Sequence, residues 1–154
     1  MDFQQLAEEL IRTIRSLNKS SFVMDLNRYA KGEMLVLNYL YQHQEELIVP
    51  GDISNFTGTS SARIATILGS LEEQGYLTRE IDRTDRRKIL VALTEKGETV
   101  ARTHHDFMLN RLASVLEYMG ENESQQFLQS IKTFVEAGKL VLQKQEMEKE
   151  EENA

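Results

Sequence analysis

Residues Asp82-Arg83-Thr84-Asp85-Arg86-Arg87 are the stretch that decides the fold of this chain. They lie between two short runs with a β-pattern, Tyr76 to Ile81 and Lys88 to Leu93, and apolar residues of the second run alternate onto one face. A hairpin tip with three arginines, followed directly by a lysine, cannot be a core element. Exposed guanidinium groups on such a loop suit contact with phosphates or with a narrow minor groove. A solvated turn with offsetting charges is the alternative that the loop alone leaves open.

The segment before this hairpin, Asp52 to Leu77, has the pattern of two short helices joined by a tight turn. Pro50 fits the first position of a helix, and Gly58 supplies the turn. Thr59 or Ser60 can cap the second helix through a side-chain oxygen. Four apolar residues of that second helix repeat at helical spacing and are expected to face inward: Ile64, Ile67, Leu68 and Leu71.

The other faces of the predicted second helix carry small and polar residues. Ser61, Arg63 and Thr66 lie away from the apolar stripe, and Gly75 provides a C-terminal stop. A short helix, a turn, a second helix with a small polar first turn and a basic β-hairpin together make a winged helix-turn-helix. The second helix of this motif enters the major groove N-terminus first, and small residues there let the backbone approach the DNA.

These residues resemble the MarR family of bacterial transcription regulators. The resemblance rests on the hexapeptide 82–87 followed by Leu93-Thr94-Glu95-Lys96-Gly97, at this spacing from a helix that ends in Leu71-Glu72-Glu73-Gln74-Gly75-Tyr76-Leu77. It covers about residues 34–97 by motif, and the rest of the chain by length and helix order. It implies a mainly α fold with a small β-wing, in which a winged helix-turn-helix is flanked by N- and C-terminal dimerisation helices. Thr66 departs from the pattern, because many relatives carry an arginine there.

Long apolar stripes at helical spacing lie outside this region. One stripe near the N-terminus consists of Phe3, Leu6, Leu10, Ile14 and Leu17. Another near the C-terminus consists of Phe127, Ile131, Phe134, Val135, Gly138 and Leu142. A winged helix of about 60–70 residues needs far less apolar surface to cover itself, so we predict a homodimer with a shared helical core. A helical monomer that folds the stripes onto itself is the alternative.

We predict one MarR-like domain over residues 1–145, with the winged helix-turn-helix at about 33–97 and dimerisation helices at about 1–30 and 95–145. The glutamate-rich segment 146–154 is expected to be frayed helix or a disordered acidic tail. A two-fold axis would place the two recognition helices on half-sites about one helical turn apart. The operator should therefore be near-palindromic.

The composition agrees with one domain, since 40% of the 154 residues are apolar. The chain has no cysteine, which excludes a disulfide framework, a cysteine-based zinc site and the cysteine-sensing peroxide regulators of the MarR family. No apolar run approaches about 18 residues, and the early acidic residues do not read as a signal peptide. We therefore expect a cytoplasmic protein without a membrane partner.

The net charge of −7 is the main objection to DNA binding, because DNA-binding domains are usually basic. The charge is unevenly spread, however. From Lys144 onward two lysines and five glutamates give −3, whereas residues 60–93 hold six basic and five acidic side chains. Screening beyond about 8–10 Å mutes remote carboxylates, so the local potential at the wing governs contact with phosphates.

In the wing, Arg86 is expected to reach into the minor groove. Arg83, Arg87 and Lys88 are expected to contact phosphates or to brace the tip. Asp85 is expected to orient an arginine by a charge-assisted hydrogen bond without touching DNA itself.

In the recognition helix, Ser60 and Ser61 are expected to hold phosphates or base edges. Arg63 is the best candidate for reading a guanine, and Thr66 for contacting a thymine methyl group. Simple surface exposure is the alternative for Thr66. Together with the wing, these side chains make double-stranded DNA the predicted partner, for a regulator that acts as a repressor of nearby genes.

The MarR resemblance also implies a small-molecule ligand in the crevice between the dimerisation helices and the winged helix, where it can alter the distance between recognition helices. Candidate lining residues are Phe22, Arg28, Tyr29, Tyr39 and His43. The alternative to a DNA-binding regulator is a winged-helix dimer that binds another protein, for which the acidic charge leaves room.

The three histidines are His43, His104 and His105. His104 and His105 point about 100° apart on one helix and cannot easily share a metal. A zinc-responsive repressor that combines His43 with one of them remains a minor alternative, implied by zinc-sensing relatives. No Ser-His-Asp spacing, glycine-rich phosphate loop or pair of catalytic carboxylates stands out. We therefore predict no enzyme activity, no cofactor and no metal.

Overall fold

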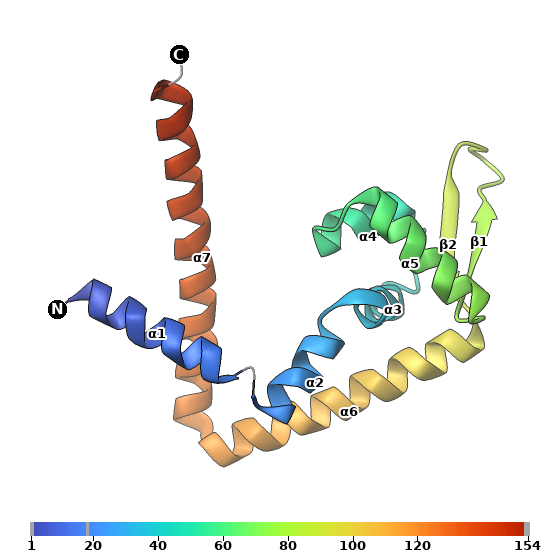
Figure 1. The fold of residues 1–154 in the computed structure, drawn as a ribbon. Helices are drawn as coiled ribbons and strands as arrows, with labels where there is room; N and C mark the ends of the chain where they lie inside the picture. The colour runs from blue at the N-terminus through green and yellow to red at the C-terminus, as the bar shows by residue number, and fades with distance from the viewer. Residues whose placement is uncertain (1, 18, 153–154) are drawn as a thin grey trace. The chain divides into compact units, whose positions relative to one another are not determined.

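Helices make up most of the chain, and one antiparallel hairpin interrupts them (Figure 1). The computed structural model describes residues 2–17 and 19–152. In order the elements are α1 (Phe3–Leu17), α2 (Ser21–Tyr29), α3 (Gly32–Gln42), α4 (Pro50–Thr57), α5 (Ser61–Glu73), β1 (Leu77–Ile81), β2 (Ile89–Leu93), α6 (Glu95–Met119) and α7 (Glu121–Glu152). The predicted mainly α fold with a small β-wing is confirmed. No helix in the described part of the chain is both long and apolar enough to cross a membrane.

The chain divides into two compact units, Met1–Met108 and Leu109–Ala154, where the sequence led us to expect a single domain over residues 1–145. The boundary falls inside α6, whose buried residues are Gly97, Ala101 and Met108. No residue of α6 beyond Met108 is buried.

The structure defines two segments more closely than the sequence prediction did. The nine-residue helix α2 lies in the region that was predicted only as N-terminal dimerisation helices, about residues 1–30, and Ser20 precedes it without a side-chain capping bond. Helix α7 continues through Glu152, so residues 146–152 are helical, which is the first of the two alternatives, frayed helix or disorder, expected for this segment. Residues 153–154 of the predicted tail lie outside the described residues.

The core of the first unit forms around α3, whose central residues Val36 to Leu40 are all buried. Ile53 of α4 and Ile64, Leu68 and Leu71 of α5 pack into the same cluster with Leu77 and Val91 of the strands. The inward-facing stripe predicted for the recognition helix is thus buried, except that Ile67 is half-buried at its edge.

Local signals fix the ends of the two helices of the helix-turn-helix. Pro50 opens α4, and the backbone N–H of Val49 donates to the Asp52 carboxylate over 2.9 Å. Gly58 ends α4 with φ at 63°, a left-handed conformation that glycine adopts without strain. Ser60 then caps α5, since its Oγ accepts from the Arg63 N–H at 3.4 Å.

The end of α5 leads directly into the wing. The N–H of Tyr76 donates to the Leu71 carbonyl and that of Gly75 to the Glu72 carbonyl, both over 2.9 Å, which is the Schellman pattern of a helix end. The antiparallel strands pair Leu77 with Leu93 and Ile81 with Ile89 at the two ends of the register. The hairpin is therefore anchored at its base and free at its tip.

Thr94 joins the hairpin to α6. Its hydroxyl donates to the Gly75 carbonyl over 2.7 Å and accepts from the N–H of Gly97 over 3.1 Å, so it caps α6. A Cβ atom added to Gly97 would lie 1.8 Å from the carbonyl oxygen of Tyr76. Only glycine therefore lets the first turn of α6 approach the base of the wing this closely.

Candidate nucleic-acid interface

The tip of the wing is an ordered loop with cations on its outside. The N–H of Asp82 donates to the Lys88 carbonyl over 3.0 Å, and the N–H of Lys88 to the Asp85 carbonyl over 2.9 Å. Both aspartates also bond the loop through their carboxylates, Asp82 to the N–H and hydroxyl of Thr84 at 2.7 Å each, and Asp85 to the N–H of Arg87 at 3.2 Å. These backbone and carboxylate bonds shape the loop.

The two carboxylates of the wing therefore serve its structure. Hydrogen bonds from Thr84 hold the pKa of Asp82 below its usual range, and those from Arg87 do the same for Asp85. The arginine that Asp85 orients is Arg87, whose Nε lies 3.1 Å from Oδ1. Among the described residues Arg86 has no ion-pair partner, which leaves its guanidinium available.

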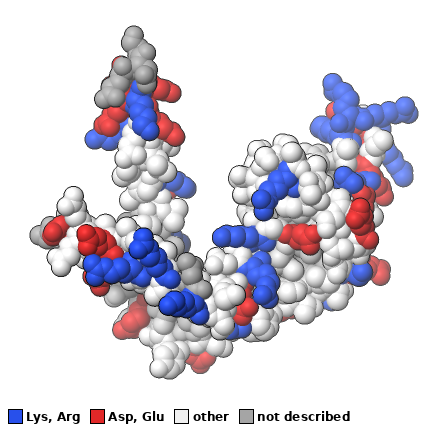
Figure 2. Space-filling model, viewed as in Figure 1, with Lys and Arg blue, Asp and Glu red and all other residues white. Residues whose placement is uncertain are grey.

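Positive charge consequently gathers at the end of the hairpin (Figure 2). Four exposed cations lie there against two half-buried carboxylates: Arg83, Arg86, Arg87 and Lys88. Ile89 and its strand partner Ile81 are also exposed, at 44% and 65%, so the alternation predicted for β2 buries only the half of the strand next to the core.

A salt bridge fixes the wing against the recognition helix. Arg79 of β1 donates from Nε to the Glu72 carboxylate of α5 over 3.0 Å, and its Nη2 contacts the same oxygen. The bond from Arg79 lowers the pKa of Glu72, and the bond to Glu72 raises the pKa of Arg79. Sequence reasoning missed this pair, because the two residues are seven positions apart across a turn.

The predicted contact residues of the recognition helix are all accessible to a ligand of the size of DNA. Ser60, Ser61, Arg63 and Thr66 are all exposed at or after the start of α5. The Thr66 hydroxyl donates to the Ala62 carbonyl over 3.1 Å, so a thymine methyl group would meet the methyl rather than the hydroxyl of Thr66. Ser60, Arg63 and Thr66 thus line one hollow on α5, whereas Ser61, two positions before Arg63 on the helix, does not line it. The wing residues lie in one loop.

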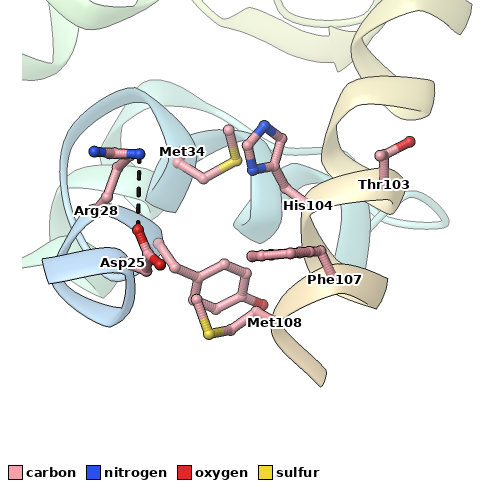
Figure 3. Close-up of a pocket in the computed structure, with 8 residues that line it drawn as sticks. Asp25, Arg28, Met34, Thr103, His104, Phe107 and Met108 are labelled. Atoms are coloured by element: carbon pink, nitrogen blue, oxygen red, sulfur yellow. Dashed lines mark ion pairs between the residues drawn. The ribbon is translucent and has the colours of Figure 1, made fainter. Parts of the chain in front are cut away.

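A cavity of about 320 Å³ lies between α2, α3 and the first half of α6 (Figure 3). Of the predicted crevice residues, Arg28 and Tyr29 line it. Nη1 of Arg28 lies 3.9 Å from Oδ1 of Asp25, which also lines the cavity. The remaining lining residues, which sequence reasoning missed, are Met34, Thr103, His104, Phe107 and Met108. They come from helices far apart in the sequence, so no local pattern pointed to them.

The other predicted crevice residues lie elsewhere. On a helix Tyr39 is rotated by about 140° from Met34, which does line the cavity. The Tyr39 ring packs instead against the rings of His43 and Phe56, with centroids 4.3 Å and 4.6 Å away. Phe22, Tyr39 and His43 do not line this cavity of the single chain, and their place in the predicted crevice of a dimer stays a prediction.

The three histidines take separate places. His43 bonds the Tyr39 carbonyl through Nδ1 at 2.8 Å, His104 lines the cavity, and His105 bonds the Tyr29 hydroxyl at 2.9 Å. Within residues 2–17 and 19–152, no three histidine or carboxylate side chains gather in a way that could hold a metal ion. The geometry therefore adds nothing to the zinc-responsive alternative.

The fold and this site define a winged helix-turn-helix of the kind found in transcription regulators. A family model described as MarR family matches residues 28–88. The structure of FabT from Streptococcus pneumoniae in complex with DNA is similar, with a TM-score of 0.66 and 22% identity over 88% of this chain and 99% of that one. The structure of a MepR–DNA complex from S. aureus has a TM-score of 0.66 and 20% identity, over 85% of this chain and 96% of that one.

A curated relative is the HTH-type transcriptional repressor YetL of Bacillus subtilis (strain 168), which is 21% identical over 102 residues. That alignment covers 66% of this chain and 61% of the relative's length. The chain therefore has the fold of the MarR-family transcription regulators, and the resemblance inferred from the sequence is confirmed.

Proposed function

We propose that this chain is a sequence-specific regulator of transcription that binds double-stranded DNA as a homodimer. The observation that carries the proposal is the wing, where four exposed cations project at the end of the hairpin (Figure 2). The first turn of α5 is exposed as well. A helix-turn-helix presents such a turn to the major groove, and arginines on a projecting loop suit the neighbouring minor groove. The DNA complexes of the FabT and MepR neighbours support this use of the fold.

Exposed apolar stripes support the homodimer. The α1 stripe from Phe3 to Leu17 is 41–75% exposed in the single chain, and no residue of α1 is buried. On α7, Phe127, Ile131 and Phe134 are 44–64% exposed. An isologous dimer would bury both stripes and place two recognition helices on half-sites about one turn apart. A near-palindromic operator follows, and repression is favoured by the name of the curated relative.

The wing is tested by replacing Arg86 with alanine. Loss of a minor-groove arginine should weaken binding to a selected duplex by about 1–3 kcal/mol. Arg102→Ala, which removes an exposed arginine from α6, is the matched control and should leave the affinity unchanged. Fluorescence anisotropy at several salt concentrations measures both. Equal affinity of wild type and Arg86→Ala would eliminate the wing assignment.

The cavity supports control by a small apolar ligand. Its wall is mostly apolar and aromatic, with the Arg28–Asp25 pair at the rim available to a polar group. A ligand found by thermal-shift screening should change the affinity for the duplex. Thr103→Trp, which fills the cavity from an exposed position, should abolish that change and leave binding of the duplex intact. A ligand effect that survives this substitution would contradict the cavity assignment.

The acidic net charge of −7 leaves one alternative function open, that of a winged-helix dimer that binds another protein. The two functions differ in their response to salt, because binding to phosphates releases counterions. Salt-dependent binding to duplex DNA supports the regulator, and failure to bind any duplex leaves the protein-binding module. A regulator of chromosomal genes would act in the cytoplasm.

A further inference from the structure

We propose that the DNA interface extends from the recognition helix into a groove that ends at Lys31, and that Lys31 binds a backbone phosphate of the same duplex. This inference rests on the proposed function. It adds a contact from the loop between α2 and α3, which belongs neither to the helix-turn-helix nor to the wing.

The groove has a volume of about 520 Å³. One wall is the loop between α2 and α3 with the first turns of α3, and the other is the turn after α4 with the first turns of α5. Figure 1 shows α3, α4 and α5 packed together in this part of the fold. The polar residues along the groove are Lys31, Thr57, Thr59, Ser60 and Arg63.

The groove is continuous with the predicted DNA-reading surface. A second hollow of about 610 Å³ runs along the exposed side of α5 and is lined by Ser60, Ala62, Arg63, Thr66 and Ile67. Ser60, Arg63 and Ile67 line both hollows. A strand of DNA that meets Arg63 in the second hollow therefore has an open path to Lys31 through the first.

The charge of the groove matches a phosphodiester chain. Among the described residues that line it, Lys31 and Arg63 are the only ionisable ones, and both are exposed. Glu33, the nearest carboxylate in sequence, is turned to α5, where it accepts from the Ser70 hydroxyl at 2.6 Å and from Nε2 of Gln74 at 3.4 Å. Two cations in a lining without a carboxylate suit a polyanion. Because the path is open at its ends, it suits a long polyanion such as a phosphodiester chain.

Lys31→Ala tests the inference through the salt dependence of binding. Removing one lysine–phosphate bond should reduce the log–log salt slope by about 0.9, so a dimer with the substitution in both chains should show a slope about 1.8 units shallower. Because a phosphate contact carries no base information, affinity should fall by the same factor on selected and random duplexes. Lys31→Arg should restore the slope.

Lys19→Ala removes an exposed lysine from the preceding loop and serves as the matched control. If wild type binds duplex and Lys31→Ala has the same slope as wild type and Lys19→Ala, the inference is wrong while the proposed function stands. If wild type binds no duplex, both fail. If Lys31→Ala abolishes binding of inorganic phosphate but leaves the duplex slope unchanged, the groove holds a free anion and the assignment to DNA is overturned.

Discussion

Gly97 allows the first turn of α6 to pack closely against the base of the wing. It lies at the first turn of α6, where the backbone of Tyr76 comes so close that any Cβ would overlap the carbonyl oxygen. The same turn is capped by Thr94, whose hydroxyl bonds both Gly75 and Gly97. One glycine and one threonine therefore join the wing, the end of the recognition helix and α6.

Gly97→Ala should destabilise the chain. Its methyl group would meet backbone rather than a movable side chain, so α6 or the hairpin must shift, and overpacking of this kind costs about 1–3 kcal/mol. Urea denaturation followed by circular dichroism measures the free energy of unfolding.

Gly69→Ala is the matched control, since Gly69 lies inside α5 with open space where its Cβ would be. Alanine is the better helix former, so this variant should be more stable by up to about 1 kcal/mol. The account of Gly97 is wrong if both glycines respond alike to alanine.

At the scale of elements, the wing and the recognition helix are joined by two contacts. The Glu72–Arg79 salt bridge links α5 to β1, and the end of α5 runs into β1 through the turn at Gly75. These contacts hold the strands of the wing, but not its tip, against the end of the recognition helix.

This salt bridge gives the stability a pH dependence with a definite sign. The pKa of Glu72 lies below its ordinary value of 4.5 because Arg79 donates to the carboxylate. The stabilisation is therefore fully present above about pH 4.5 and is lost as the pH falls through the lower pKa of the folded state.

Thermal melts of wild type and Glu72→Gln between pH 3 and 7 measure this loss. The two proteins should differ at neutral pH and converge at the acid end. Parallel curves over the whole range would show that Glu72 contributes nothing through its charge.

The elements that sequence predicted well are those with local signals. The turn at Gly58, the cap at Ser60, the stop at Gly75 and the alternation of β2 each involve residues a few positions apart. The cavity escaped prediction because α2, α3 and α6 meet there from distant parts of the chain. The packing of Tyr39 against His43 and Phe56 was not predicted either, since the rotation of α3 about its axis depends on the whole core.

At the scale of the whole molecule, the acidic charge and the basic wing have separate places along the chain. The wing tip holds four cations, whereas the C-terminal end of α7 is rich in glutamate. Exposed apolar stripes on α1 and α7 remain uncovered in a single chain. The account therefore requires a second copy to complete the fold.

Ile131→Glu should convert the predicted dimer to a monomer, because it places a carboxylate in the exposed stripe of α7. Lys132→Glu, at the neighbouring position on the helix, changes the charge further while leaving the stripe apolar, and should stay dimeric. Sedimentation equilibrium reports the mass of each. If wild type is already monomeric at micromolar concentration, the stripes serve another purpose.

The most direct test of the central claim is one titration of the purified chain into a duplex selected from random DNA, repeated between about 50 and 200 mM salt. The account predicts two chains per duplex, a near-palindromic selected sequence and an affinity that falls steeply as salt rises. Failure to bind any duplex at low salt, or a complex with one chain per duplex, would contradict it.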